Sequence, residues 1–354
     1  MLLTILIVFF SLIGLMVLHE FGHFLIAKQF KARVEEFGIG YPPRIFSKKI
    51  GETVYSLNLL PFGAFVRIPG METVENEEMA KREKVWKRIL VTLGGVISFW
   101  VIAIIILSIL LVIGVPEAFD DKANVNNSQI QILTVNSNSP AEKTGLKAGD
   151  VILKIKNQNI GKVTEVQEFI SAHKGEEIIL TIKRGEKIFE TKIIPRVSES
   201  KEEGPLGIAL GRIAFVKYPI WQAIPKAIIL CFNLTKTIVL FLIQFLFGSL
   251  IGKPLPFKAE LMGPIGIGAL MVQFYQLGIN YFLQILVLIS LGLAVSNLLP
   301  IPAVDGGKLL FLIIEAIRKK PVSQKIEQNI TAVSFVFILI LSIFIAIKDV
   351  IKLF

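Results

Sequence analysis

The chain has few residues of the two types that most often bind transition metals. Among its 354 residues there are one cysteine and three histidines. A single cysteine excludes an internal disulfide framework and any zinc site built from several thiolates. A metal bound by this chain must therefore be held by histidines and carboxylates, and only His19, His23 and His173 can supply an imidazole.

Charge is also missing from four long stretches of the chain. These are Met1–Leu18, Ile89–Val115, Leu261–Val304 and Ile330–Ile347. Each includes the roughly 20 apolar residues that cross a bilayer, which predicts a polytopic protein embedded in the lipid bilayer. The net charge of +10 does not indicate nucleic acid as a partner, because basic and acidic residues are interspersed.

Basic residues flank the expected spans unevenly. They cluster after the first span, before the second, and between the last two at Lys319 and Lys320. The positive-inside rule makes these loops cytoplasmic and places the domain that follows the second span outside the cytoplasm. The expected segments are a transmembrane helix at 1–27, a cytoplasmic-side loop at 28–88, a transmembrane helix at 89–115, a soluble domain at 122–197, a linker at 198–222, an interfacial or re-entrant helix at 223–260, a third transmembrane region at 261–317, a cytoplasmic loop at 318–329 and a fourth transmembrane helix at 330–352.

The segment Ala223–Gly248 is the ambiguous one. It is apolar except for Lys226 and Lys236 and is long enough to cross the membrane. A crossing here would move Lys319 and Lys320 to the outer face, against the charge rule. We therefore expect an interfacial or re-entrant helix and about four transmembrane helices in all, with a fifth span as the alternative.

The soluble segment 122–197 has the pattern of a compact α/β module. Its expected elements are strands at 130–135, 151–155, 178–183 and 188–193 and a helix at 163–172. The stretch Ser139–Asp150, SPAEKTGLKAGD, resembles bacterial PDZ domains. Such domains bind peptide or protein termini by strand addition. In this chain the domain either does the same or only filters bulky substrates.

His19, Glu20 and His23 form an HExxH pattern at the end of the first span. Residues four apart share a helix face, so both imidazoles can reach one zinc ion while the glutamate approaches its bound water. Ionisable residues at membrane depth are costly and mostly functional. The alternative is a cluster that reaches the interface without binding metal. His173 is expected at the surface of the soluble domain.

A catalytic zinc ion needs a third protein ligand. Of the few acidic residues outside the charged loops, Asp305 is singled out by its setting. It follows a long apolar stretch that two prolines end, and irregular backbone at membrane depth is tolerated only where it is buried or lines a wet cavity. The expected topology brings it to the membrane side where the first span delivers His19 and His23. A plain helix N-cap is the alternative for Asp305.

Three motifs in order resemble the site-2 intramembrane zinc metalloproteases of the RseP type, over essentially the whole chain: HEFGH at 19–23, the PDZ stretch, and NLLPIPAVDGG at 297–307. The resemblance implies Zn2+ held by His19, His23 and Asp305, Glu20 as catalytic base, and Asn297 as a contact to the substrate backbone. It also implies a multi-pass protein of the bacterial cytoplasmic (inner) membrane whose zinc site lies near the cytoplasmic side. The implied substrates are membrane proteins with a transmembrane segment, such as anti-sigma factors or signal-peptide remnants.

Members of this family carry a membrane-associated β-hairpin after the first span. Here Glu52–Leu59 alternates as a strand, a turn is expected at 60–63, and Ala64–Ile68 returns as a second strand. Because a substrate helix must unwind before cleavage, a strand edge offers its backbone new partners; a hairpin that only covers the site is the alternative. The expected substrate-binding residues of this region are Gly40, Tyr55, Leu57, Gly63 and Phe65. The chain departs from the family's Gly-x-Gly loop at Pro42, which leaves the role of this loop open. Lys308 stands where a histidine is often found, and this difference is expected to matter little because the position is not a metal ligand.

The expected fold is thus a polytopic α-helical membrane protein with a membrane-associated β-hairpin and one inserted α/β PDZ domain. The expected function is intramembrane proteolysis by a zinc metalloprotease. The rival from another class is a non-proteolytic PDZ-bearing membrane scaffold with a structural metal. A metal transporter is less well supported, because it needs several sets of ligands along a path.

Overall fold

The computed structural model describes residues 2–69, 84–125, 127–197, 204–248 and 262–353. The chain forms two compact units, of which the first comprises Met1–Ser108, Ile224–Val272 and Ile285–Phe354. The second comprises Ile109–Ala223 and Gln273–Gln284. Parts of the expected cytoplasmic loop (70–83), linker (198–203) and interfacial segment (249–260) lie outside the described residues.

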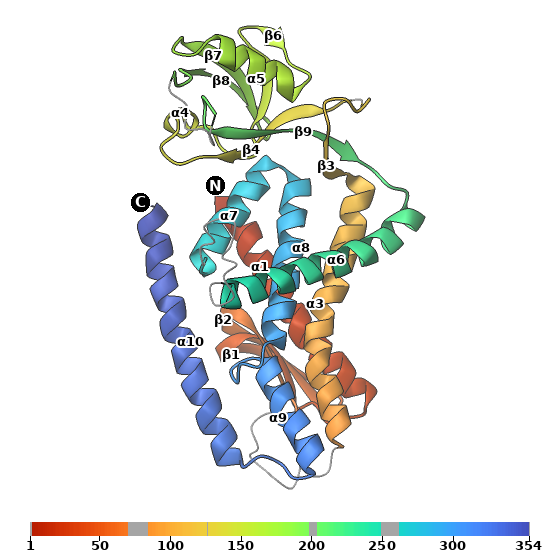
Figure 1. Ribbon diagram of the computed structural model, residues 1–354. Helices are drawn as coiled ribbons and strands as arrows, with labels where there is room; N and C mark the ends of the chain where they lie inside the picture. The colour runs from red at the N-terminus through yellow and green to blue at the C-terminus, as the bar shows by residue number, and fades with distance from the viewer. Residues whose placement is uncertain (1, 70–83, 126, 198–203, 249–261, 354) are drawn as a thin grey trace. The chain divides into compact units, whose positions relative to one another are not determined.

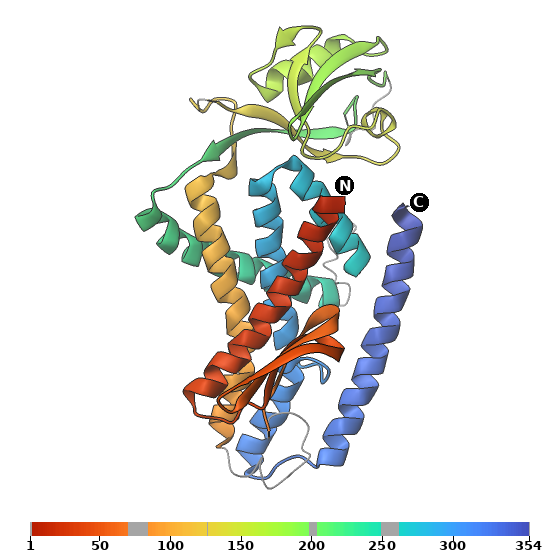
Figure 2. The ribbon, with the colours of Figure 1, turned by 180° about the vertical axis from the view of Figure 1, so that it is seen from behind.

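The first unit is built from long helices and a small sheet (Figures 1 and 2). The helices, some of which extend past the unit's boundary, are α1 (Leu2–Gln29), α3 (Val85–Ile113), α6 (Ile220–Phe247), α7 (Pro264–Leu277), α8 (Ile279–Leu298), α9 (Asp305–Arg318) and α10 (Gln324–Leu353). The hydroxyl of Ser290 on α8 donates to the carbonyl of Phe99 on α3 at 2.9 Å. A polar side chain buried in an apolar bundle thereby gains the partner it needs and fixes α8 against α3.

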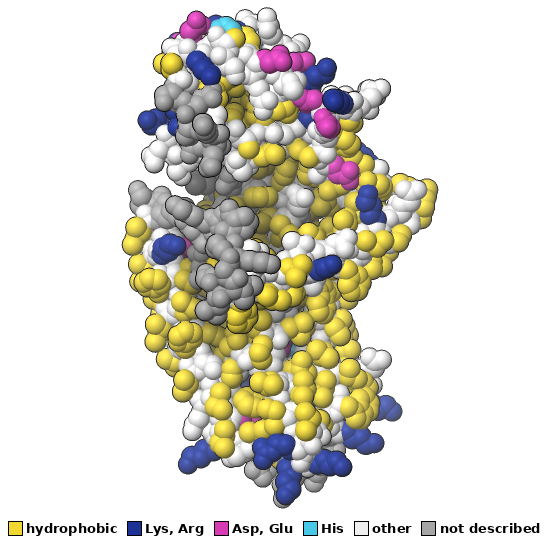
Figure 3. Space-filling model, viewed as in Figure 1, with side chains coloured by type: hydrophobic (Ala, Val, Ile, Leu, Met, Phe, Trp, Pro, Cys, Tyr) yellow, Lys and Arg dark blue, Asp and Glu magenta, His cyan; other side chains and the backbone are white. Residues whose placement is uncertain are grey.

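Five helices of the described chain are long and apolar enough to cross a membrane: α1, α3, α6, α8 and most of α10. Figure 3 shows apolar side chains over the surface of the helical unit, with Lys and Arg gathered at the end where α9 finishes. Length and composition thus support a membrane protein, while the number of spans and their direction stay predictions. The expected third transmembrane region contains three helices, α7, α8 and α9.

Helix α6 runs across α3 and α8 instead of alongside them (Figures 1 and 2). It is fixed to α3 midway, where the indole Nε1 of Trp100 donates to the hydroxyl of Thr235 at 3.1 Å. This direction is compatible with the interfacial or re-entrant helix expected over 223–260. Whether α6 crosses the membrane stays a prediction.

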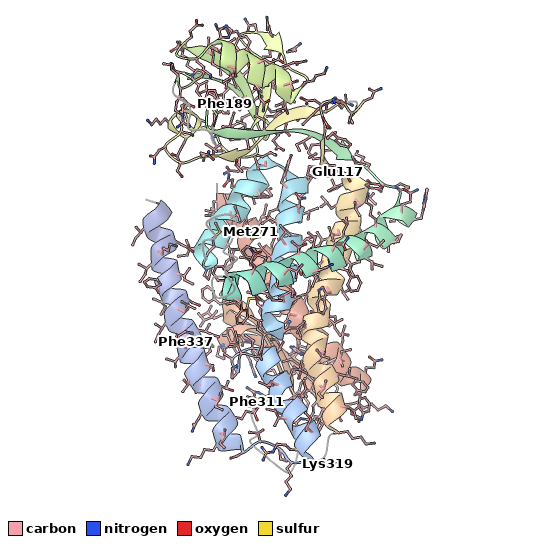
Figure 4. All side chains as sticks on the ribbon, in the orientation of Figure 1. Glu117, Phe189, Met271, Phe311, Lys319 and Phe337 are labelled. Atoms are coloured by element: carbon pink, nitrogen blue, oxygen red, sulfur yellow. The ribbon has the colours of Figure 1, made fainter. Side chains whose placement is uncertain are left out.

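The apolar side chains of helix α10 (Gln324–Leu353) are mostly exposed. None of the 18 residues in its most apolar stretch is fully buried. Figure 4 labels Phe337 on α10, whose side chain is 67% exposed, and Met271 on α7, which is fully buried. The one buried carboxylate of α10, Asp349, accepts hydrogen bonds from the N–H groups of Gly263 and Gly266 at 2.9 and 2.8 Å. An anion at the start of α7 satisfies helix donors and favours the positive end of the helix dipole.

The sheet of the first unit consists of the long strands β1 (Glu36–Ile50) and β2 (Thr53–Arg67). Ile39 of β1 lies opposite both Leu57 and Ala64 of β2. The two short strands expected within 52–68 therefore both pair with β1, and the tight connection is the turn at 51–52 instead of 60–63. Gly63, with a φ of +139°, lies where β2 bends to make this pairing.

The β1–β2 sheet packs on α1 through aromatic side chains. Phe37 and Tyr55 lie 5.5 and 6.0 Å from Phe24 of α1, measured between ring centroids. Inside the sheet the carboxylate of Glu36 accepts hydrogen bonds from Arg44 and Ser56, both at 2.6 Å. These contacts hold the sheet beside the end of α1 that carries the HExxH pattern.

The second unit contains the strands and the helix expected of the soluble α/β module, and it is here called the PDZ-like unit after the resemblance of its sequence. Its sheet has the order β3-β9-β4-β5-β7-β8, with β6 paired to β5. The elements are β3 (Val115–Phe119), β4 (Gln129–Val135), α4 (Pro140–Lys143), β5 (Val151–Ile155), β6 (Gln158–Asn159), α5 (Val163–Ala172), β7 (Ile178–Arg184), β8 (Lys187–Ile193) and β9 (Ile208–Val216). Fully buried branched residues such as Ile132, Ile155 and Leu180 form its core.

Strands β3 and β9 lie outside the expected domain limits of 122–197. The segment 198–222 was expected to be a linker, but Ile208–Val216 within it forms β9, which pairs with both β3 and β4. The sequence does not show this because the partners of β9 lie about 70 to 100 residues earlier in the chain, and strand pairing over that distance leaves no local periodicity.

Candidate metal centre

Three side-chain atoms converge where α1 meets the start of α9. Oδ2 of Asp305 lies 3.1 Å from Nε2 of His19 and 3.3 Å from Nε2 of His23, and the two Nε2 atoms are 3.3 Å apart. His23 is buried, and the side chains of His19 and Asp305 are only 13% and 12% exposed. The helix α1 supplies both imidazoles because its turn places residues four apart on one face.

This triangle has the dimensions of three corners of a tetrahedral zinc site. With zinc to nitrogen or oxygen distances of about 2.0 to 2.2 Å, the corners of a tetrahedron lie about 3.3 to 3.6 Å apart. Within the described chain, the buried Oδ2 of Asp305 makes no properly oriented hydrogen bond, although two imidazole nitrogens are near it. The three atoms thus face a shared space, and two imidazoles with one carboxylate are a donor set that suits zinc.

The ring of His23 is oriented by the backbone of α3. Its Nδ1 lies 2.8 Å from the carbonyl oxygen of Val91, which can only accept a hydrogen bond. Nδ1 therefore carries the proton, and Nε2 presents its lone pair to the shared space. The ring of His19 stacks on Phe99 of α3, with 4.7 Å between the ring centroids and an angle of 19° between the planes.

Two adjacent glycines of α3 make room for the site. A Cβ on Gly95 would lie 2.2 Å from Nε2 of His23 and 2.6 Å from Cε1 of His19. A Cβ on Gly22 of α1 would lie 2.3 Å from the carbonyl oxygen of Gly94. The absence of side chains at Gly22 and at the Gly94–Gly95 pair lets α1 and α3 approach closely, as in other membrane helix pairs.

Asp305 is the first residue of α9 and does not cap that helix. The N-cap residue is Val304, which makes no side-chain cap hydrogen bond. The Cβ positions of Gly306 and Gly307 would lie 2.1 and 2.3 Å from the backbone of the preceding loop. The Gly-Gly pair therefore allows the loop after α8 to fold tightly against the start of α9, which turns the Asp305 carboxylate toward α1.

A pocket of about 140 Å³ opens beside the three converging side chains. Its lining consists of Glu20, His23, Tyr41, Ala64, Phe65, Val66, Ile68, Val91, Thr92, Asp305 and Lys308. The second half of β2 thus lies along one wall, with Glu20 and Asp305 in the same pocket. A carboxylate that is not itself in the triangle, Glu20, is placed where it can act on a molecule held there.

Of the residues expected to bind substrate, one lines the pocket and the others lie elsewhere. Phe65 lines the pocket, and Gly63 packs beside Tyr41 and Met16. Tyr55 belongs to the aromatic contact with α1, and Leu57 is 48% exposed on the sheet.

Gly40 and Asn297, the other two expected substrate-binding residues, are engaged with nearby backbone. Gly40 has a φ of +77° and packs on the backbone of Leu60. The amide of Asn297 donates to the carbonyl of Leu293 within α8 at 3.0 Å. The structure brings neither of them into the lining of the pocket.

The residues that shape the site without charge were not predicted from the sequence. Val91 contributes a carbonyl, Phe99 a ring face and Gly95 the absence of a side chain. A Gly-Gly pair inside an apolar span was the available signal for the last of these. Tyr41 also lines the pocket and was not among the expected contacts.

The chain matches peptidase family M50 over residues 7–341. A Clostridium perfringens protein whose name proposes a zinc metalloprotease is 32% identical over 339 residues, which are 96% of each chain. The regulator of sigma-W protease RasP of Bacillus subtilis is 27% identical over 95% of each chain. The zinc metalloprotease RasP of Oceanobacillus iheyensis is 26% identical over 99% of this chain and 100% of its own.

Among solved structures, the PDZ domain of an SdrC-like protein of Listeria monocytogenes aligns with part of the chain. The alignment covers 25% of this chain and 93% of that domain, at 24% identity and a TM-score of 0.22.

Proposed function

Since the chain belongs to peptidase family M50 and is a site-2 intramembrane zinc metalloprotease, we propose that His19, His23 and Asp305 hold its zinc ion and that Glu20 is its catalytic base. The observation that carries this assignment is the triangle of ligand atoms with sides of 3.1 to 3.3 Å. The expectation of a scaffold without proteolytic activity has no support among the relatives.

The bound zinc ion would supply a Lewis acid and lower the pKa of water toward about 7. The residues of the chain do the rest. The Val91 carbonyl keeps the proton of His23 on Nδ1, so that Nε2 stays a ligand. Glu20, on the helix turn that carries both imidazoles, takes the proton of the attacking water and delivers it to the leaving amine.

The substrate would lie along the second half of β2. Ala64–Arg67 pairs with β1 on one side, and its other edge has no strand partner among the described residues. Three of these residues line the pocket. A transmembrane segment that unwinds loses its internal hydrogen bonds, and this edge offers its backbone replacements.

The proposed setting is the bacterial cytoplasmic membrane, with the metal centre toward the cytoplasm and the PDZ-like unit outside. The basic residues around 84–88 and 318–325 support this orientation. The name of the Bacillus subtilis relative refers to the regulation of a sigma factor. We propose anti-sigma factors or remnant signal peptides as substrates.

The PDZ-like unit would bind an extended peptide terminus at β9. Strand β3 pairs only with Arg212–Val216, so Ile208–Gly211 has β4 on one side and no described strand on the other. Helix α5 packs beside β9. An unpaired edge next to a helix is the arrangement that strand addition requires. A role as a size filter is the alternative.

Cleavage of a tagged single-span substrate by the purified full-length chain tests the assignment. Glu20→Gln should keep its zinc and lose about 10²- to 10⁴-fold in rate, because it removes the general base. Asp305→Ala should lose zinc as well. Glu186→Gln, an exposed residue of the PDZ-like unit, is the matched control and should cleave like the parent. A Glu20→Gln variant that cleaves at the parent's rate would refute the mechanism.

A further inference from the structure

The pocket beside the metal centre holds polar groups that the proposed mechanism does not use. The mechanism uses the carboxylates of Glu20 and Asp305 and the imidazole of His23. The polar groups that it leaves unused are those of Tyr41, Thr92 and Lys308. The Thr92 hydroxyl is already engaged, because it donates to the carbonyl of Arg88 at 3.0 Å. Tyr41 and Lys308 are therefore the donors that remain for a bound molecule.

Lys308 is placed by the same helix as Asp305. It lies three residues further along α9, so both side chains share one face of the first turn. Its ammonium forms no ion pair or hydrogen bond with any residue that the structure describes, and its charge acts on Glu20 across the pocket. Arg88, by contrast, is bound by both carboxylate oxygens of Glu315 at 3.0 and 3.1 Å. Lys308 is thus a pocket-lining cation without an ion-pair partner among the described residues.

Peptide hydrolysis creates a need for such a group. As the water oxygen bonds to the carbonyl carbon, the water proton passes to Glu20 and the electron pair of the C=O π bond moves onto the carbonyl oxygen. When the C=O bond re-forms, the C–N bond breaks and the proton held by Glu20 passes to the leaving nitrogen. Negative charge therefore appears and disappears on the carbonyl oxygen, and a fixed donor beside it lowers the barrier.

We propose that Lys308 is a further catalytic residue, whose ammonium donates a hydrogen bond to the scissile carbonyl oxygen as it becomes negative. The lysine keeps its protons throughout. This inference rests on the proposed function of the same site. Tyr41, whose ring stacks on Phe65, is the rival donor, but its phenol is neutral. A charged donor binds an oxyanion more strongly than a neutral one.

The test compares Lys308→Met and Lys308→Arg in the purified full-length enzyme loaded with zinc. Lys308→Met should lower kcat by about 10²- to 10³-fold, as the loss of one oxyanion donor does, with KM and zinc content close to those of the parent. Lys308→Arg keeps the charge and should recover activity to within about tenfold of the parent. Lys320→Met removes a lysine beyond the end of α9 and should leave kcat unchanged.

A phosphinic peptide gives a readout that does not depend on turnover. Its tetrahedral anionic group copies the charge of the attacked carbonyl, so it should bind Lys308→Met about 100-fold more weakly than the parent. Lys308→Gln, which stays polar, provides a second variant if Lys308→Met cannot be purified, and the same results are required of it.

Three results would overturn the role of Lys308. They are an unchanged kcat in Lys308→Met, a rise in KM alone, and a loss of kcat in Tyr41→Phe with none in Lys308→Met. Each would leave the proposed function intact, provided that Glu20→Gln is inactive. A Glu20→Gln enzyme that still cleaves would instead remove the proposed function, so the two failures are distinguishable.

Discussion

A methyl group added at Gly95 should empty the metal centre without unfolding the protein. The new Cβ would lie 2.2 Å from Nε2 of His23 and 2.5 Å from Cε1 of the same ring. Ordinary contacts of a Cβ begin near 3.4 Å, so the ring of His23 must retreat by about 1 Å. Zinc ligands tolerate deviations of only about 0.2 Å, and the triangle with Asp305 would open beyond that limit.

The expected size of the effect follows from this displacement. Changes to the groups that orient zinc ligands typically cost 10- to 100-fold in affinity, and Gly95→Ala displaces a ligand atom itself. We therefore expect a loss of zinc affinity of at least about 100-fold, with a cost of about 1–3 kcal/mol in stability from overpacking. Helix propensity does not add to this cost, because alanine favours the helix more than glycine does.

Zinc content after dialysis against a weak chelator measures the first effect, and cleavage of the single-span substrate measures its consequence. Gly14→Ala is the matched control, because it adds the same methyl group to α1 at a position where nothing lies within 4 Å. It should keep both zinc and activity. If Gly95→Ala retains the zinc content and rate of the parent, the placement of the two imidazoles against α3 is wrong.

Two further predictions concern the sheet and the PDZ-like unit. Glu36→Gln weakens the charged hydrogen bonds from Arg44 and Ser56 and should lower the free energy of unfolding by about 1–3 kcal/mol. The loss should appear as a lower melting temperature and faster proteolysis. An unchanged melting temperature would contradict this prediction. Partial burial raises the pKa of Asp121, but hydrogen bonds from the N–H groups of Val163 and Thr164 lower this pKa by more than burial raises it. The pKa of Asp121 therefore lies below its ordinary value. This stabilisation is complete above the unfolded pKa of about 3.9 and is lost as the pH falls through the folded pKa. The difference in melting temperature between parent and Asp121→Asn should therefore be smaller at about pH 3 than at about pH 6. A difference that stays constant would argue against the capping role.

The parts of the PDZ-like unit that the sequence predicted are those with local signals. Helix α5 spans Val163–Ala172 and β5 spans Val151–Ile155, both as expected. Their alternation or helical period is set by burial of one face and can be read within ten residues. Strand β9 was not predicted, because its partners are distant in the chain and its own pattern is too short to separate it from a linker.

The β1–β2 sheet shows the same limit in another form. Two strand segments within 52–68 were expected, and both exist. They were expected to pair with each other through a turn at 60–63, which is wrong, because β1 pairs with each of them and the register depends on where β2 bends. The sequence thus indicated strands, while the fold decided which edge of them faces the pocket.

The residue types of the chain already restrict the chemistry of the site. With one cysteine and three histidines, the chain could build a zinc centre only from His19, His23 and a carboxylate, and the helical spacing of four residues already places the two imidazoles on one face. The tertiary structure decided what no spacing can show: which carboxylate turns toward them, that Val91 fixes one ring and Gly95 leaves room for both, and that Lys308 faces the same pocket. These contacts join α1, α3 and α9, which lie far apart in the chain, so their residues acquire a role only when the helices pack.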